Sequence, residues 1–73
     1  MSHEEAEVTK KFGIHLAKLR EQAGISQQKL AEEINVDRTY ISLIERGLRN
    51  PTLKRLWMIS KVLKIDLAEL VTF

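Results

Sequence analysis

The sequence contains no cysteine, and only one proline and three glycines, in 73 residues. Without cysteine the chain can form neither a disulfide nor a thiolate metal site. A chain of this length makes one domain at most and hides only about 60% of the surface that its unfolded form exposes. We therefore expect marginal stability, and oligomerisation is the support that remains available.

Several classes of function lack their sequence signals. His3 and His15 show no spacing typical of metal ligands, so neither a metal nor another cofactor is expected. No apolar run is long enough to span a membrane, and residues 1–7 are acidic without the apolar core of a signal peptide, which predicts a cytoplasmic protein. There is no phosphate-cradling glycine loop and no nucleophile–base set, and the chain is too small to enclose a substrate. The sequence thus argues against an enzyme and against a small-molecule ligand.

The positive charge is concentrated in one segment. The whole chain has a net charge of only +2, but residues 37–55 contain five basic and two acidic residues, which gives +3 there and leaves −1 elsewhere. The basic residues of this segment are Arg38, Arg46, Arg49, Lys54 and Arg55. A basic segment of this kind favours an anionic partner.

Two helical patterns occupy the first half of the chain. Apolar residues recur every three or four positions from Val8 to Ala23, and Gly24 ends this pattern in the way a left-handed residue ends a helix. The predicted inner face is Val8, Phe12, Leu16, Leu19 and Ala23. Ser26 can cap a short second helix over 27–34, after which Asn35 fits a left-handed turn. Val36 then fills the corner.

Three further helices are predicted after this turn. Asp37 can cap a helix over 38–45, which Gly47 ends, and one face of this helix stays polar. Thr52 can cap a fourth helix and Asp66 a short fifth one. The predicted inner face of the fourth helix is Leu53, Leu56, Ile59, Ser60 and Leu63, and the fifth helix carries Leu67, Leu70 and Val71. No segment has a strand pattern, so we expect an all-α, compact five-helix domain over residues 1–73.

The second and third helices, joined by a tight turn, are typical of a helix-turn-helix, which lays its second helix in the DNA major groove. The segments GISQQKLAEEINVDRTYISLIERG and NPTLKRLWMISKVLKIDLAEL resemble the XRE family, the Cro and phage-repressor type of helix-turn-helix. The stretch DRTYISLIERGLRN is further similar to the controller proteins of restriction-modification systems. Lys64 departs from this family, which usually has glycine there, and Val62 stands where alanine is frequent.

The resemblance implies a sequence-specific transcription regulator that binds a two-fold symmetric site on double-stranded DNA, with a helix-turn-helix at about residues 26–46. Arg38 at the start of the third helix can bind guanine O6 and N7 together, and is the first choice for reading a base. The predicted base-reading residues are Arg38, Thr39, Tyr40 and Ser42. The predicted phosphate-binding residues are Gln27, Arg46, Arg49 and Asn50.

Some of these residues have structural alternatives. Asp37 is chiefly a helix cap, and Tyr40 could instead pack over the second helix. The family pairs the glutamate at Glu45 with an arginine of the first helix, here Arg20, so we expect a structural ion pair. Lys54 and Arg55 fit either a DNA contact or a solvated helix face, and this alternative stays open.

Apolar residues exceed the needs of one small core, which predicts a homodimer. The dimerisation region spans about residues 57–73, and in the resembling controllers the last helix forms the two-fold contact. The predicted interface residues are Trp57, Met58, Val62, Leu67, Leu70, Val71 and Phe73. Aspartate at Leu70 and Phe73 is then expected to give monomers. The alternative is that the C-terminal cluster merely covers the core of one subunit.

Two other functions compete with the controller, namely an antitoxin or interaction module of the XRE type and a phage-like repressor. An antitoxin of this type often wraps its partner with a disordered tail, which the sequence does not contain. Because no ligand-binding domain is evident either, protein concentration is the expected regulatory variable, acting through dimerisation.

Overall fold

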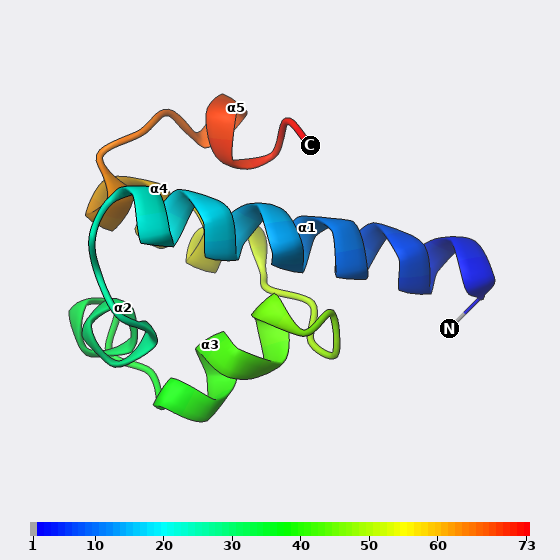
Figure 1. Cartoon of the computed structure of the whole chain (residues 1–73), viewed down its shortest axis with the longest axis horizontal. Coiled ribbons are helices and arrows are strands. Elements are labelled where there is room, and N and C mark those ends of the chain that lie inside the picture. Colours follow the sequence, from blue (N-terminus) through cyan, green and yellow to red (C-terminus); the bar gives the residue numbers. More distant parts are fainter. Residues whose placement is uncertain (1) are drawn as a thin grey trace.

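The computed structural model describes residues 2–73, which form five helices and no strand, as the sequence predicts. They are α1 (His3–Gln22), α2 (Gln27–Glu33), α3 (Arg38–Glu45), α4 (Leu53–Leu63) and α5 (Leu67–Leu70). Helices α1 and α4 cross the middle of the molecule, with α2 and α3 on one side and α5 on the other (Figure 1). No helix within residues 2–73 is both long and apolar enough to cross a membrane.

Side-chain caps fix the starts of the first four helices. Ser26, Asp37 and Thr52 each accept a backbone N–H of the first turn that follows, which confirms three predicted starts. Helix α1 begins earlier than its apolar pattern predicts, at His3. There Ser2 and Glu5 form a reciprocal capping box, in which the Glu5 N–H donates to Ser2 Oγ at 3.2 Å.

The turns that separate these helices use left-handed residues. Asn35 has a φ of 59°, as predicted for the corner between α2 and α3, and Gly24 and Gly47 also have positive φ. Lys64 has a φ of 59° as well and ends α4 in the left-handed conformation. Lysine therefore adopts a left-handed backbone conformation that glycine reaches more easily.

The core draws on all five helices. Its buried apolar residues are Phe12, Leu16, Leu30, Ala31, Ile34, Ile41, Ile44, Ile59, Leu63 and Leu70. Ser60 is buried with them, and its hydroxyl donates to the carbonyl oxygen of Trp57 at 2.7 Å.

Three predicted inner-face residues are exposed instead. Val8, in the N-terminal part of α1, is 55% exposed, and Ala23 is the exposed residue that caps the other end of this helix. Leu53 is the first residue of α4 and is 70% exposed. A helical period alone does not show where a helix leaves its neighbours, which is why these three predictions were wrong.

Glycine lets α1 and α3 approach closely. A Cβ at Gly13 would lie 2.5 Å from the carbonyl oxygens of both Ile44 and Glu45. A Cβ at Gly47, just after α3, would lie 2.7 Å from Lys10 Cα. The C-terminal end of α3 thus rests directly on the α1 backbone, and this contact sets the direction in which the helix-turn-helix points.

Candidate nucleic-acid interface

Ile41 and Ile44 of α3 point into the core, so the opposite, polar face of this helix points outward. Arg38, Thr39 and Arg46 are exposed and Ser42 is half-buried, which leaves these side chains accessible on one surface. The Asp37 carboxylate accepts the Thr39 N–H at 2.8 Å. This bond, and then the Thr39 hydroxyl, hold the pKa of Asp37 below its usual value. Asp37 therefore acts as a cap that orders the first turn of α3.

A buried carboxylate joins α1, α2 and α3. Glu45 accepts hydrogen bonds from Arg20 Nε at 2.7 Å, from a terminal nitrogen of Arg20 at 3.1 Å and from Gln27 Nε2 at 2.8 Å. The side chains of Arg20 and Glu45 are only 13% and 7% exposed, and the hydrogen bond to Glu45 raises the pKa of Arg20. Arg20 also donates to the carbonyl oxygen of Ile25 at 2.9 Å, which ties in the turn before α2. The predicted ion pair is confirmed.

The amide of Gln27 has a second N–H beyond the one that Glu45 holds. A hydrogen bond to a buried, ion-paired carboxylate restricts the rotamers of the Gln27 side chain, so this second N–H has a fixed direction. Ordered N–H groups at the start of a helix suit a phosphate oxygen. The contact between Gln27 and Glu45 was absent from the sequence prediction, which assigned Gln27 only to phosphate.

Tyr40 lies between two arginines. The guanidinium carbons of Arg49 and Arg55 lie 5.2 and 5.8 Å from the centre of its ring, within the range of cation–π contacts. Arg55 also donates to the carbonyl oxygen of Ile34, the residue that ends α2, at 3.2 Å. Arg55 therefore braces the end of α2, a contact that neither of the two alternatives for this residue included. Lys54 stays exposed and outside these contacts.

Known proteins resemble this chain in both sequence and structure. A family model described as helix-turn-helix matches residues 16–70. The control protein C.MunI of Mycoplasma sp. is 49% identical over 61 residues, which cover 82% of each chain. The controller C.AhdI of Aeromonas hydrophila has a TM-score of 0.85 at 36% identity, with 94% of this chain and 99% of that chain covered. The controller C.Esp1396I, from a nucleoprotein complex, has a TM-score of 0.71 at 35% identity, covering 90% and 96%.

The chain belongs to the helix-turn-helix family. Within that family it groups with the control proteins, which confirms the resemblance and the prediction of a DNA-binding transcription regulator.

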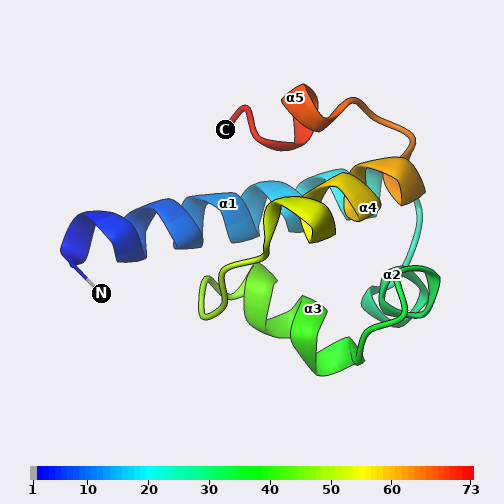
Figure 2. The ribbon, with the colours of Figure 1, turned by 180° about the vertical axis from the view of Figure 1, so that it is seen from behind.

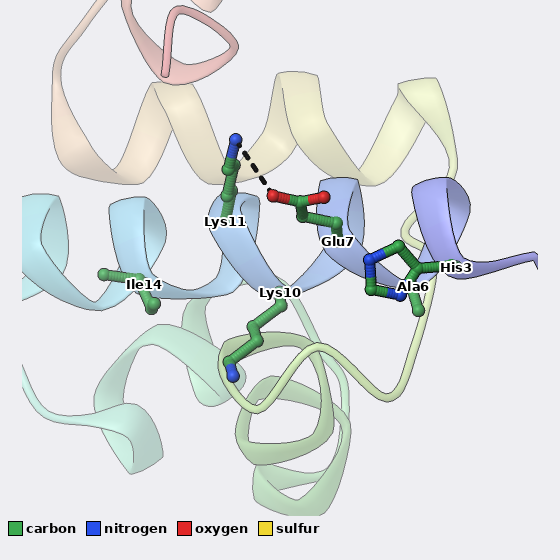
Figure 3. Close-up of a pocket in the computed structure, with 6 residues that line it drawn as sticks. All are labelled: His3, Ala6, Glu7, Lys10, Lys11 and Ile14. Atoms are coloured by element: carbon green, nitrogen blue, oxygen red, sulfur yellow. Dashed lines mark ion pairs between the residues drawn. The ribbon is translucent and has the colours of Figure 1, made fainter.

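One basic residue of this helix-turn-helix protein was missed in the sequence. Lys10 lies on α1 directly over Gly47, and its side chain extends toward the segment after α3, whereas Lys11 pairs with Glu7 at 3.5 Å (Figure 3). Lys10 thus stands near Arg46 and Arg49 in the fold although it is far from them in sequence. A sequence pattern could not find it, because the close approach at Gly47 brings it there.

The predicted dimer residues divide among different places. Val71 and Phe73 are exposed and border a hollow of about 190 Å³ between α1, the loop before α4 and the C-terminal residues. This C-terminal hollow is lined by Val8, Thr9, Phe12, Arg49, Asn50, Pro51, Leu56, Val71 and Phe73. Phe73 packs edge-on against Phe12, with 5.6 Å between ring centres.

Other predicted interface residues do not belong to this hollow. Leu70 is completely buried, because α5 has only four residues and this one enters the core, so its assignment to an interface is wrong. Leu67 is half-buried and packed against the core, and Met58 is half-buried near Arg55. Val62 lines a separate groove, and Trp57 is exposed beside Lys61.

Proposed function

We propose that this protein binds a palindromic operator as a homodimer and controls transcription of the genes of a restriction-modification system, acting on DNA in the cytoplasm. One observation supports this most strongly. The exposed polar face of α3 is held in a fixed orientation by the Glu45 hydrogen bonds and by the Gly13 contact. A preset recognition helix of this kind suits the major groove. Similarity to C.MunI and C.AhdI supports the restriction-modification context.

In this proposal the polar residues have two different roles. Arg38 reads a guanine, while Thr39, Tyr40 and Ser42 make secondary contacts to bases. Arg49, Asn50, Arg46 and Gln27 bind phosphates and position α3, as backbone contacts generally do. Lys10 joins this second set because of its place over Gly47.

The dimer forms at the C-terminal hollow. Val8, Val71 and Phe73 leave apolar surface open there, and burial of that surface favours association. Arg49 and Asn50 line the same hollow, so a two-fold contact brings both DNA-binding loops close to the symmetry axis. The dimerisation surface therefore includes Val8, Thr9 and Phe12 of α1, in addition to part of the 57–73 region that the sequence predicts.

The operator hypothesis is tested by footprinting on the DNA that flanks this reading frame. We expect protection of two half-sites whose centres are about 34 Å apart, or a multiple of that distance. Adjacent genes for a methyltransferase and an endonuclease would support the restriction-modification context. Protection of one asymmetric half-site at saturation would contradict the dimer.

The interface is tested with Phe73→Asp, for which Ile14→Asp is the matched control. Both side chains are exposed, at 53% and 61%, but only Phe73 lines the C-terminal hollow. Sedimentation should show monomers for Phe73→Asp and dimers for Ile14→Asp, with helical circular dichroism retained in both. If Phe73→Asp were still dimeric, the C-terminal hollow would not be the dimer interface. Leu70→Asp is unsuitable because it would unfold the core.

A further inference from the structure

The groove that Val62 lines lies at the opposite end of the molecule from the C-terminal hollow. It has a volume of about 510 Å³ and is lined by Ile25, Lys29, Glu33, Lys61, Val62 and Lys64. We call it the α2–α4 groove. Figure 2 shows α2 and the end of α4 at one end of the molecule and the start of α1 at the other. No residue lines both the groove and the hollow, so a dimer built on the hollow leaves the groove open.

The groove also faces away from the proposed DNA contacts. Residues two positions apart on a helix point in nearly opposite directions, because each residue turns the helix by about 100°. Gln27 points toward Glu45 and α3, whereas Lys29 on the same helix lines the groove. The surface is therefore accessible in a dimer that is bound to its operator.

The lining combines an apolar floor with a basic rim. Ile25 and Val62 are half-buried apolar side chains that protein atoms leave only partly covered. Lys29 pairs with Glu33 at 3.0 Å, but Lys61 and Lys64 have no ion pair with any of residues 2–73. Lys61 lies over the exposed ring of Trp57, 5.5 Å from its centre, which extends the apolar surface along α4.

We propose that the α2–α4 groove binds an acidic protein segment that inserts an aliphatic side chain between Ile25 and Val62. The carboxylates of such a segment pair with Lys61 and Lys64, and its apolar residue covers the floor. A nucleic-acid backbone matches the lysines but offers no apolar group to the floor, so a protein segment fits the surface better. A bound dimer can then contact another protein while it holds its operator.

The experiment is a nuclear magnetic resonance titration of the full chain. The probe is a synthetic amphipathic helix rich in Glu and Leu, and the control probe has Lys in place of Glu. We expect the acidic peptide to shift the methyl signals of Ile25 and Val62 and the indole signal of Trp57. The Lys-rich peptide should leave these signals unchanged.

Two sets of variants locate the binding. The double variant Lys61→Glu/Lys64→Glu should weaken acidic-peptide binding by about tenfold or more, because two attractive charges become repulsive. Val62→Ser should also weaken acidic-peptide binding, because it removes apolar surface from the floor of the groove. The matched control Lys11→Glu/Lys18→Glu changes the net charge equally on α1 and should leave the affinity unchanged. Operator binding by the Lys61→Glu/Lys64→Glu variant should stay within about twofold of the original, since these lysines lie off the proposed DNA face.

Three results would overturn the proposal. The first is equal weakening by the two double variants, which would mean attraction by net charge alone. The second is a shift of the groove signals by duplex DNA, which would make the groove part of the DNA surface. The third is an acidic-peptide footprint on α3 in place of Ile25 and Val62. None of these results would alter the operator footprint, so the two proposals fail separately.

Discussion

The α2–α3 unit and the C-terminal segment both carry exposed residues with proposed functions, but they are held in different ways. Helices α2 and α3 have side-chain caps, at Ser26 and Asp37, and Glu45 joins them to α1. Helix α5 has only four residues, and Asp66 makes no side-chain capping bond. It is attached through the buried Leu70, through Leu67, which packs against the core, through the ring contact of Phe73 with Phe12, and through the hydrogen bond from His15 to the carbonyl oxygen of Glu69.

The difference matches the two tasks. A recognition helix must present its side chains in one geometry before it meets DNA, so that little conformational entropy is lost on binding. A subunit interface can gain its final order from the partner chain. We therefore expect damage to the α2–α3 attachments to cost stability, whereas damage near the C-terminus should act mainly on the dimer.

The largest effect is expected where α1 meets α3. Gly13→Ala should destabilise the fold by about 3 kcal/mol, because its Cβ would clash with backbone carbonyls that cannot move aside. Gly24→Ala is the control. It also adds one methyl group, but no atom lies within 4 Å, so only the positive φ opposes it, at about 1 kcal/mol. Urea denaturation measures both, and equal costs would contradict the close approach.

The next effect concerns the carboxylate that joins three helices. Arg20→Ala should cost about 2–3 kcal/mol, because the nearly buried Glu45 carboxylate loses its ion-pair partner and retains only the hydrogen bond from Gln27. The double variant Arg20→Ala/Glu45→Ala should cost less than the sum of the single variants, since it removes the unpaired charge as well. Thermal unfolding of the four proteins of this cycle measures the coupling. Strict additivity would mean that the pair contributes nothing.

A smaller effect is expected at the C-terminal end. His15 Nε2 is 3.0 Å from the carbonyl oxygen of Glu69, so His15→Ala should cost about 1 kcal/mol. Amide hydrogen exchange should quicken in α5 and leave α3 unchanged. His3→Ala is the matched control, since that histidine is exposed on the free end of α1. Faster exchange in α3 as well would show that the two regions do not open separately.

The smallest effect is a pH dependence at Asp37. Because its folded pKa is lowered, its capping contribution is fully present above the unfolded value of about 3.9 and is lost as the pH falls through the lower folded value. Asp37→Asn retains a capping oxygen that does not titrate. Below about pH 4, the unfolding midpoint of the original protein should therefore fall more steeply than that of Asp37→Asn. Parallel curves would show that the Asp37 carboxylate does not contribute to this pH dependence.

Local signals predicted the helix-turn-helix well. Asp37 and Gly47 bracket α3, and Asn35 marks the left-handed corner, so sequence alone gave the bounds of α3. The capping box of Ser2 and Glu5 is an equally local signal that was overlooked at the start of α1.

The remaining features depend on how the helices meet. Glycine inside a helix usually weakens it, and the need for Gly13 becomes visible only when α3 packs against α1. In the same way, Lys10 comes close to the segment after α3 only through the contact at Gly47. Leu70 and Val71 are adjacent apolar residues, yet one is buried and the other exposed. Periodicity cannot separate them in a four-residue helix. Periodicity also does not show that Val62 and Phe73 lie on separate surfaces, which is why the sequence prediction assigned both to one interface.

Arg38 is proposed to read a base, whereas Arg49 is proposed to hold the DNA backbone. Titration of both alanine variants on operator and scrambled DNA, over several salt concentrations, separates these two roles. Arg38→Ala should cost about 1–3 kcal/mol on the operator, relax discrimination at one base pair and affect scrambled DNA much less. Arg49→Ala should weaken both DNAs alike and reduce the slope of log K against log salt by about 0.9 for each phosphate that the arginine neutralises. Equal weakening of operator and scrambled DNA by Arg38→Ala would contradict base reading by Arg38.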